Sequence, residues 1–414
     1  MTSLKPVRGT HDLLGEDAWR HRHVVEAFRD FAGRYGFSEL ATPIFEFTEV
    51  FQRTLGETSD VVQKEMYTFE DRGGERVTLR PEFTAGIARA FISGGMAQNV
   101  PCKFFSHGPV FRYERPQKGR LRQFHQINLE VLGVPENQAD VEVIALASDL
   151  LADLGIGDKT TLELNTLGDS ESRGAYRKVL VDYFSAHKGD LSDDSKARLE
   201  RNPLRILDSK DAGDRDLIER APRMADYLNS VSADFFAGVR EGLDRIGITY
   251  AVNDRLVRGL DYYTHTAFEF TTTFLGAQGA VIAGGRYDGL IEQMGGKSTP
   301  GIGWAGGIER LGMLLEDIPP PPRPLVVVPI GDGAQMLALS LTQELRSAGF
   351  RVDMGYRGNV GKRMKRADRI GARAALLLGE DEIGQGVVKI RDLDSGDEIT
   401  VPLTDVANRL NMYR

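Results

Sequence analysis

The spacing of hydrophobic and polar residues predicts a helix followed by a series of strands in the first part of the chain. Residues 24–35 repeat apolar positions with a helical period. The clearest strand is HQINLEV, residues 125–131, which sets Gln126, Asn128 and Glu130 on one face and apolar residues on the other. Similar stretches joined by turn residues indicate an antiparallel sheet.

The pattern changes after IPPPPRP, residues 318–324, because four consecutive prolines can continue neither a helix nor a central strand. Beyond this linker, apolar runs such as LVVVPI alternate with helical stretches, which favours a partly parallel sheet. Residues 169–240 are charged and mostly helical in pattern.

The predicted fold class is therefore α+β. The expected domains are 1–317, with a central antiparallel sheet flanked by helices and a helical insertion at about 169–240, and 325–414, an α/β domain with a mixed sheet.

Composition narrows the function classes. The 414 residues carry a formal net charge of −8, which argues against coating nucleic acid through bulk charge but leaves local basic patches open. No apolar run is long enough to span a bilayer, and the first residues lack the apolar core of a signal peptide, so we expect a cytoplasmic protein. Cys102 is the only cysteine, which leaves no internal disulfide, and we expect no metal site. His21 and His23 lie in a charged helical stretch and are interpreted as solvated surface residues.

The stretch FRYERPQKGRLRQFHQINLE concentrates positive charge in an acidic protein. Its cations are Arg112, Arg115, Lys118, Arg120 and Arg122. Two antiparallel strands, FRYER and LRQFHQINLEVLG, joined by a PQKG turn, would bring Arg112 and Glu114 beside Gln126 and Glu130. Such a floor suits a small zwitterion together with a phosphate, because the arginine fork pairs two oxygens at once. A hydrated outer face of the sheet is the alternative.

Three further stretches carry candidate chemistry. Glu82 and Thr84 precede a predicted helix, where they either cap it or bind an amino group. Arg258, in LVRGLDYY, is flanked by apolar residues and would be costly to bury without a partner. The glycine-rich residues 283–311 end near Arg310 and fit neither a P-loop nor a Rossmann fingerprint, so the glycines serve either a ligand or close packing. No nucleophile triad is evident, which favours a reaction catalysed by positioning and charge stabilisation.

Taken in order, these motifs resemble those of the histidyl-tRNA synthetase family, which are class II aminoacyl-tRNA synthetases, here of bacterial type. GFSELATPIFE resembles motif 1, the dimer-interface element, FRYERPQKGRLRQFHQ resembles motif 2, and GIGWAGGIERL resembles motif 3. LVRGLDYY and AGGRYDGL resemble the two histidine-specific signatures, and the resemblance covers nearly the whole chain.

The resemblance implies a role for each matching residue. Those implied to bind histidine are Glu82, Thr84, Gln126, Glu130, Tyr262 and Tyr263, with Glu130 and Tyr263 at the imidazole. Those implied to bind ATP are Arg112, Glu114, Arg120 and Arg310, and those implied to act in catalysis are Arg258, Arg112 and Arg310. Those implied to contact the histidine tRNA are Arg115, Gln117, Lys118, Lys362, Lys365 and Arg366. Magnesium would accompany ATP, and the chain would form a homodimer.

The sequence departs from the family pattern in two places, and one other function competes with the ligase interpretation. Phe83, Thr264 and His265 differ from the residues of many bacterial relatives beside the pocket. The regulatory subunit of ATP phosphoribosyltransferase resembles the same catalytic domain without charging tRNA, but Arg258 and Arg310 favour the ligase. A plain solvated face is the alternative for the basic residues between 357 and 373.

Overall fold

The computed structural model describes residues 4–55, 61–209, 211–258, 262–276 and 279–413, with the side chains of residues 55, 61 and 63 left aside. The chain divides into two compact units, Met1–Ile318 and Pro319–Arg414. None of the helices in the described ranges combines the length and the apolar character needed to cross a bilayer.

An eight-stranded sheet forms the centre of the first unit, in the order β1-β5-β6-β11-β10-β9-β7-β8. Its strands are β1 (Ser38–Glu39), β5 (Cys102–Phe111), β6 (Gln123–Leu132), β7 (Thr161–Thr166), β8 (Ala251–Val252), β9 (Thr264–Thr271), β10 (Ala280–Arg286) and β11 (Gly301–Gly307). The strands from β5 to β7 in this order pair antiparallel, and the two edge pairs, β1–β5 and β7–β8, are parallel. The predicted antiparallel centre is confirmed, and its edges are mixed.

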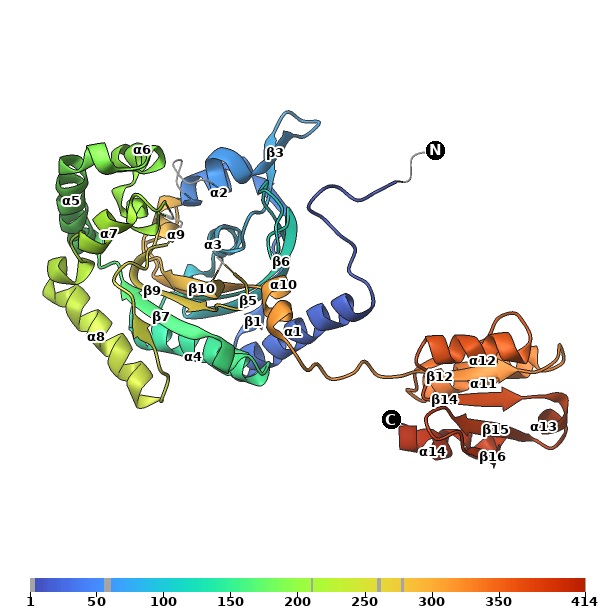
Figure 1. Cartoon of the computed structure of the whole chain (residues 1–414). Helices are drawn as coiled ribbons and strands as arrows, with labels where there is room; N and C mark the ends of the chain where they lie inside the picture. The colour runs from blue at the N-terminus through green and yellow to red at the C-terminus, as the bar shows by residue number, and fades with distance from the viewer. Residues whose placement is uncertain (1–3, 56–60, 210, 259–261, 277–278, 414) are drawn as a thin grey trace. The chain divides into compact units, whose positions relative to one another are not determined.

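Helices cover both faces of this sheet (Figure 1). The helices on one face are α1 (Gly15–Arg34), α4 (Gln138–Asp153), α8 (Ser230–Arg245) and α10 (Ile308–Leu314). Their apolar residues meet Leu129 and Trp304 of the sheet in the main core. The helices on the other face are α2 (Thr48–Leu55), α3 (Thr84–Ser93) and α9 (Leu290–Gln293). The helix predicted at residues 24–35 corresponds to the second half of α1, which begins at Gly15 and ends at Arg34.

A small antiparallel sheet lies apart from the central one and consists of β2 (Phe45–Phe47), β4 (Arg76–Leu79) and β3 (Tyr67–Glu70). Its outer residues include large exposed side chains, with Phe45 at 56% and Phe47 at 58% of full exposure. Exposed aromatic side chains gathered on one element are typical of an interaction surface.

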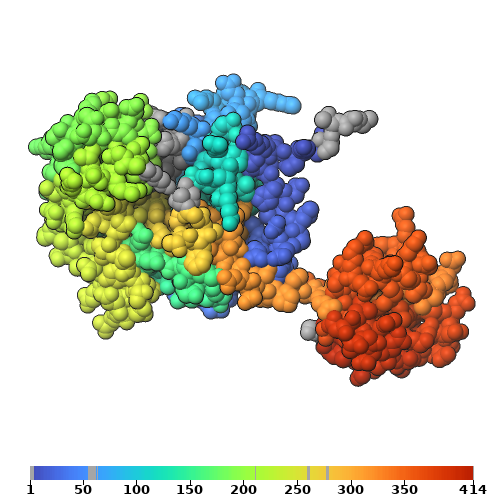
Figure 2. Space-filling view, viewed as in Figure 1, coloured from blue at the N-terminus to red at the C-terminus, as the bar shows by residue number. Residues whose placement is uncertain are grey.

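A group of short helices follows β7 and has a core of its own, which includes Tyr176, Leu180 and Phe184. Its helices are α5 (Ser170–Ala186), α6 (Asp193–Arg201) and α7 (Arg215–Arg220). We call residues 170–228 the helical insertion; it forms the green lobe of the space-filling view (Figure 2). The next helix, α8, instead buries Val239 and Leu243 in the main core.

The second unit is a five-stranded mixed sheet, in the order β13-β12-β14-β15-β16. Its strands are β12 (Leu325–Pro329), β13 (Val352–Met354), β14 (Ala374–Leu378), β15 (Val387–Asp392) and β16 (Glu398–Pro402), and its helices are α11 (Gln335–Ser347), α12 (Val360–Arg369), α13 (Glu380–Gly384) and α14 (Val406–Arg409). The first three strands in this order are parallel, and β15 and β16 form an antiparallel hairpin, so the predicted mixed sheet is confirmed.

Candidate active site

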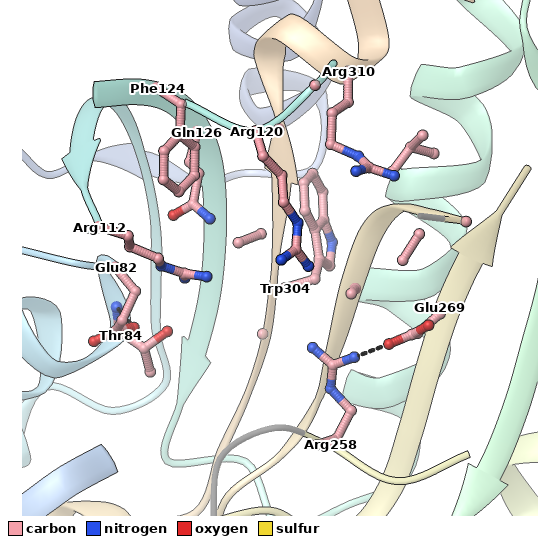
Figure 3. A pocket seen from close by; sticks show the side chains of 18 of the residues that line it. Glu82, Thr84, Arg112, Arg120, Phe124, Gln126, Arg258, Glu269, Trp304 and Arg310 are labelled. Carbon is pink, nitrogen blue, oxygen red and sulfur yellow. Dashed lines mark hydrogen bonds and ion pairs between the residues drawn. The ribbon is translucent and has the colours of Figure 1, made fainter. Parts of the chain in front are cut away.

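Residues far apart in the sequence line one cavity of about 410 Å³, on the α3 side of the central sheet. This volume is within the usual range for sites that bind small molecules. The predicted residues that line it are Glu82, Thr84, Arg112, Glu114, Arg120, Gln126, Arg258, Tyr262, Tyr263 and Arg310. Figure 3 shows Arg112 and Arg258 entering from opposite sides, with their guanidinium groups turned toward the middle. Part of the LVRGLDYY stretch, residues 259–261, lies outside the described residues.

Glu130 lies buried on β6 beside the cavity. Its carboxylate accepts hydrogen bonds from the Thr84 hydroxyl at 2.6 Å, the Asn128 amide at 3.0 Å and the Tyr287 hydroxyl. Burial raises the pKa of Glu130 to about 7, although these donors oppose the shift. The interpretation of this face as a hydrated outer surface is wrong, because Asn128 and Glu130 are both buried.

Glycines of the AGGRYDGL and GIGWAGGIERL stretches make room for the buried polar and aromatic side chains. A Cβ atom on Gly303 would stand 1.7 Å from Glu130 Oε2, and one on Gly301 would stand 2.2 Å from the Tyr287 ring. These glycines therefore serve close packing, which is one of the two interpretations of the glycine-rich stretch.

Three tyrosines form an aromatic wall next to Glu130. The ring centroids of Tyr262 and Tyr263 are 4.5 Å apart, and those of Tyr262 and Tyr287 are 5.6 Å apart. Sequence reasoning missed Tyr287. The glycines that precede it in AGGRYDGL were a usable signal, because glycine within a strand often marks a place where a ligand or another part of the backbone approaches closely.

Glu82 caps helix α3 from within the cavity wall. Its carboxylate accepts the backbone N–H groups of Thr84 at 2.6 Å and of Ala85 at 2.8 Å. Burial raises the pKa of this carboxyl, against the effect of those two bonds. The cap interpretation is confirmed, and the same carboxylate faces the cavity.

Gln126, on β6, has a side-chain oxygen that is buried and has no hydrogen-bond partner. Buried polar atoms without partners are rare in folded proteins and indicate a ligand or water in that place. Because Gln126 lines the cavity, this oxygen is suited to accept a hydrogen bond from a bound donor.

Arg258 forms an ion pair with Glu269 of β9 (Figure 3). Its side chain is only 14% exposed. Burial alone would lower its pKa, but the Glu269 carboxylate, together with Tyr263 and Tyr262, raises the pKa of Arg258 above its usual value. The expectation that this arginine needs a partner is thus confirmed. Sequence reasoning missed Glu269. This residue stands between two phenylalanines of a strand, and that alternation was a signal that the glutamate lies on the polar face of the strand, toward the cavity.

Arg112 and Glu114 lie beyond the end of β5 and not on a strand, so the prediction of a FRYER strand is wrong. The strand ends at Phe111, and Tyr113 N–H donates to the Glu65 carbonyl at 2.7 Å instead of continuing the ladder. Arg112 is fixed by a bond from Nε to the Pro81 carbonyl at 3.0 Å. Glu114 accepts a bond from Arg120 at 2.8 Å.

Arg310 enters the cavity from the start of α10 (Figure 3). Burial lowers its pKa, and the positive charge of nearby Arg120 lowers it further. Two cations held close together at a cavity are stabilised by an anion between them, which suits a phosphate.

His21 is not the solvated residue that the sequence suggests. Its ring lies edge-on to that of His125, with centroids 4.7 Å apart, and burial lowers the pKa of His21. His125 contacts the carboxylate of Glu309, whose oxygen is 2.7 Å from its Nδ1. Among the described residues, no three His, Cys, Asp or Glu side chains gather in a group that could hold a metal ion.

Comparisons with known proteins agree on one family. The histidyl-tRNA synthetase family profile matches residues 9–311, and the anticodon binding domain profile matches residues 325–412. Relatives include the histidine–tRNA ligases of Rhodospirillum rubrum, 62% identical over 97% of both chains, and Gluconacetobacter diazotrophicus, 59% identical over 98% of both chains.

The chain belongs to the histidyl-tRNA synthetase family. A solved structure of the S. aureus histidyl-tRNA synthetase without ligand is 34% identical, with a TM-score of 0.83, and the match covers 98% of this chain and 99% of that one. The family resemblance predicted from the motifs is thereby confirmed.

Residues predicted to contact tRNA in this family member lie on two exposed surfaces. Arg115, Gln117 and Lys118 are exposed on the turn between β5 and β6. In the second unit Lys362 and Lys365 are exposed on α12. The basic helix is not uniform, since Arg366 pairs with Asp353 at 2.8 Å and Arg363 is buried against the Pro329 carbonyl.

Proposed function

We propose that this chain is a histidine–tRNA ligase, which activates histidine with ATP and joins it to its tRNA. The observation that carries the proposal is one cavity with two chemically different ends. Arg112, Arg258 and Arg310 provide positive charge for phosphates, and the buried Glu130 lies beside the tyrosines at a more enclosed position. The close family relationship supports the same activity.

Histidine would occupy the end formed by Glu130 and the aromatic wall. A carboxyl and the tyrosine hydroxyls can satisfy both nitrogens of an imidazole, one as an acceptor and the other as a donor. The partnerless oxygen of Gln126 and the carboxylate of Glu82 are suited to the α-amino group. An enclosed site that hydrogen-bonds both ring nitrogens would discriminate strongly against amino acids that lack them.

The arginines would hold the phosphates of ATP for the first step. A carboxylate oxygen of histidine attacks the α-phosphorus, and pyrophosphate leaves with the electron pair of the broken P–O bond. Arg258 and Arg112 would stabilise the negative charge that develops on the α-phosphate, and Arg310 with Arg120 would hold the outer phosphates. In the second step a hydroxyl of the terminal ribose of the tRNA attacks the carbonyl carbon and loses its proton, and AMP leaves with the electron pair of the broken C–O bond.

We propose that Mg²⁺ arrives with the β- and γ-phosphates of ATP and not in a site built by the protein. Of the glutamates that line the cavity, Glu114 and Glu269 are each paired with an arginine. Glu82 accepts two backbone N–H groups and Glu309 accepts that of His125, so these carboxylates are already engaged by protein groups. Mg²⁺ commonly binds through substrate phosphates and waters, with few protein ligands.

We also propose a homodimer in the cytoplasm, formed through the small sheet that carries part of the motif 1 stretch. Ile44, Phe45, Phe47 and Phe69 are exposed there, and covering them with the same surface of a second copy would remove apolar area from water.

Charging of tRNA tests the proposal directly. Purified full-length chain, ATP and Mg²⁺ should attach labelled histidine to tRNA, and no other amino acid should be attached. A folded chain that charges no tRNA would contradict the proposal and favour the alternative, a regulatory paralogue of the ATP phosphoribosyltransferase type.

A further inference from the structure

Residues on both sides of Arg258 are hydrogen-bonded to the helical insertion, and we call each of these two attachments a fastening. The first fastening precedes Arg258 in the sequence. Arg255, three residues earlier, donates to the Glu219 carbonyl at 2.9 Å, the Ala221 carbonyl at 3.0 Å and the Pro222 carbonyl at 3.3 Å. These carbonyls lie at and just beyond the C-terminus of α7, where backbone carbonyls lack helical partners and favour a cation.

A second fastening lies on the other side of Arg258. Arg173 of α5 donates from Nη1 to the Tyr263 carbonyl at 2.8 Å, and both arginines are half-buried. Between the two, Val257 packs against the core of the insertion and also against the apolar cluster behind the cavity. Figure 1 shows α5 and α7 on the side of the central sheet where β9 and β7 lie.

We propose that Arg255 and Arg173 are positioning residues through which the helical insertion sets the place of Arg258 and Tyr263, and so the rate of histidine activation. The inference rests on the function proposed above. An arginine that must meet a developing charge has little tolerance for displacement, since a misplacement of about 1 Å can cost roughly 100-fold in rate. The insertion is on this account part of the active-site scaffold.

Replacing Arg255 or Arg173 should have little effect on the binding of ATP. The other two arginines proposed to hold phosphates, Arg112 and Arg310, come from the β5–β6 connection and from α10, whereas the two fastenings join α5 and the end of α7 to residues 255 and 263. Loss of a fastening should therefore lower kcat and raise the KM for histidine while leaving the KM for ATP nearly constant.

The test is histidine-dependent exchange of labelled pyrophosphate into ATP by the full-length chain, with each rate divided by the active sites titrated as adenylate. Arg173→Ala and Arg255→Ala should each lose on the order of 10- to 100-fold in kcat. Arg173→Lys should recover much of the loss, because an ammonium can still donate one bond to the Tyr263 carbonyl.

Arg198→Ala is the matched control. Arg198 donates to the Arg205 carbonyl at 3.2 Å inside the insertion, so the variant removes a similar bond without touching the fastened segment. Its kcat should stay within about twofold of the unchanged chain. Wild-type rates in both Arg173→Ala and Arg255→Ala, or an equal loss in Arg198→Ala, would overturn the inference. An inactive unchanged chain would instead contradict the proposed function itself.

Discussion

At the scale of single residues, the site depends on carboxyl groups that are buried where water cannot stabilise their charge. Glu130 is held by three donors and yet keeps a pKa raised to about 7, with burial as the main cause. Glu269 also has a raised pKa, mainly from burial, although Arg258 opposes the shift. Both groups are suited to bind a cationic or donating ligand, and both cost stability when ionised.

Glu130 gives a pH-dependent stability that can be measured. Its pKa is raised from 4.5 to about 7. The protonated carboxyl therefore makes a favourable contribution to the free energy of unfolding that is fully present below about pH 4.5 and is lost as the pH rises through 7. Glu130→Gln cannot ionise, and its free energy of unfolding relative to wild type should increase between pH 5 and pH 8 by on the order of 2–3 kcal/mol. Urea unfolding at both pH values measures this.

Glu49→Gln serves as the control for that experiment, because Glu49 is exposed on the surface. It should change the free energy of unfolding by less than about 0.5 kcal/mol at either pH. If Glu130→Gln showed the same difference from wild type at pH 5 and pH 8, the buried and ionising state of Glu130 would be refuted.

Arg258 should affect catalysis far more than folding. Arg258→Ala removes the cation proposed to face the reacting carboxylate and α-phosphate, and the exchange rate should fall roughly 100- to 1000-fold. Far-ultraviolet circular dichroism should be unchanged, because Glu269 can take up a proton when its partner is gone. An exchange rate close to wild type would remove Arg258 from the reaction.

At the scale of elements, regular patterns were predictable and irregular connections were not. The alternation of residues 125–131 gave the β6 strand and the side of the sheet that bears Gln126 and Glu130. The FRYER stretch has a strand-like sequence, but its backbone turns to bond Glu65, a partner far away that no local pattern reveals.

The candidate site was predictable only as far as its residues belong to motifs. Arg112, Arg258 and Arg310 stand in the motifs quoted from the sequence, and the structure brings all three to one cavity. Glu269 and Tyr287 were missed, because their importance comes from partners on other strands, and a sequence without its pairing does not show these partners.

Helix α12 makes an element-scale prediction for tRNA binding. Lys362→Ala and Lys365→Ala should each raise the KM for tRNA by roughly fivefold and reduce its dependence on salt, with pyrophosphate exchange unchanged. These lysines are exposed, whereas Arg366 also pairs with Asp353, so its replacement would mix two effects.

Lys389→Ala is the control for α12, since Lys389 lies on β15 and pairs with Glu382. It should leave the KM for tRNA unchanged. If Lys362→Ala and Lys365→Ala, like Lys389→Ala, kept the wild-type KM for tRNA, α12 would be a plain solvated surface.

At the scale of the whole molecule, the assembly is proposed to depend on the small sheet. The double variant Phe45→Glu, Phe47→Glu puts charges on its exposed face and should convert the dimer to a monomer of 45.8 kDa, as measured by light scattering. Met336→Glu alters an apolar residue on α11 that is even more exposed, and it should leave the dimer intact. A double variant that stays dimeric would place the interface elsewhere.

The most direct test of the central claim is pyrophosphate exchange with each of the twenty amino acids, using the full-length chain with Mg²⁺ and ATP. The cavity described here predicts exchange with histidine alone, because both of its ring nitrogens find partners near Glu130 and the tyrosines. Exchange with another amino acid, or none from a folded chain, would contradict the assignment of this cavity to histidine activation.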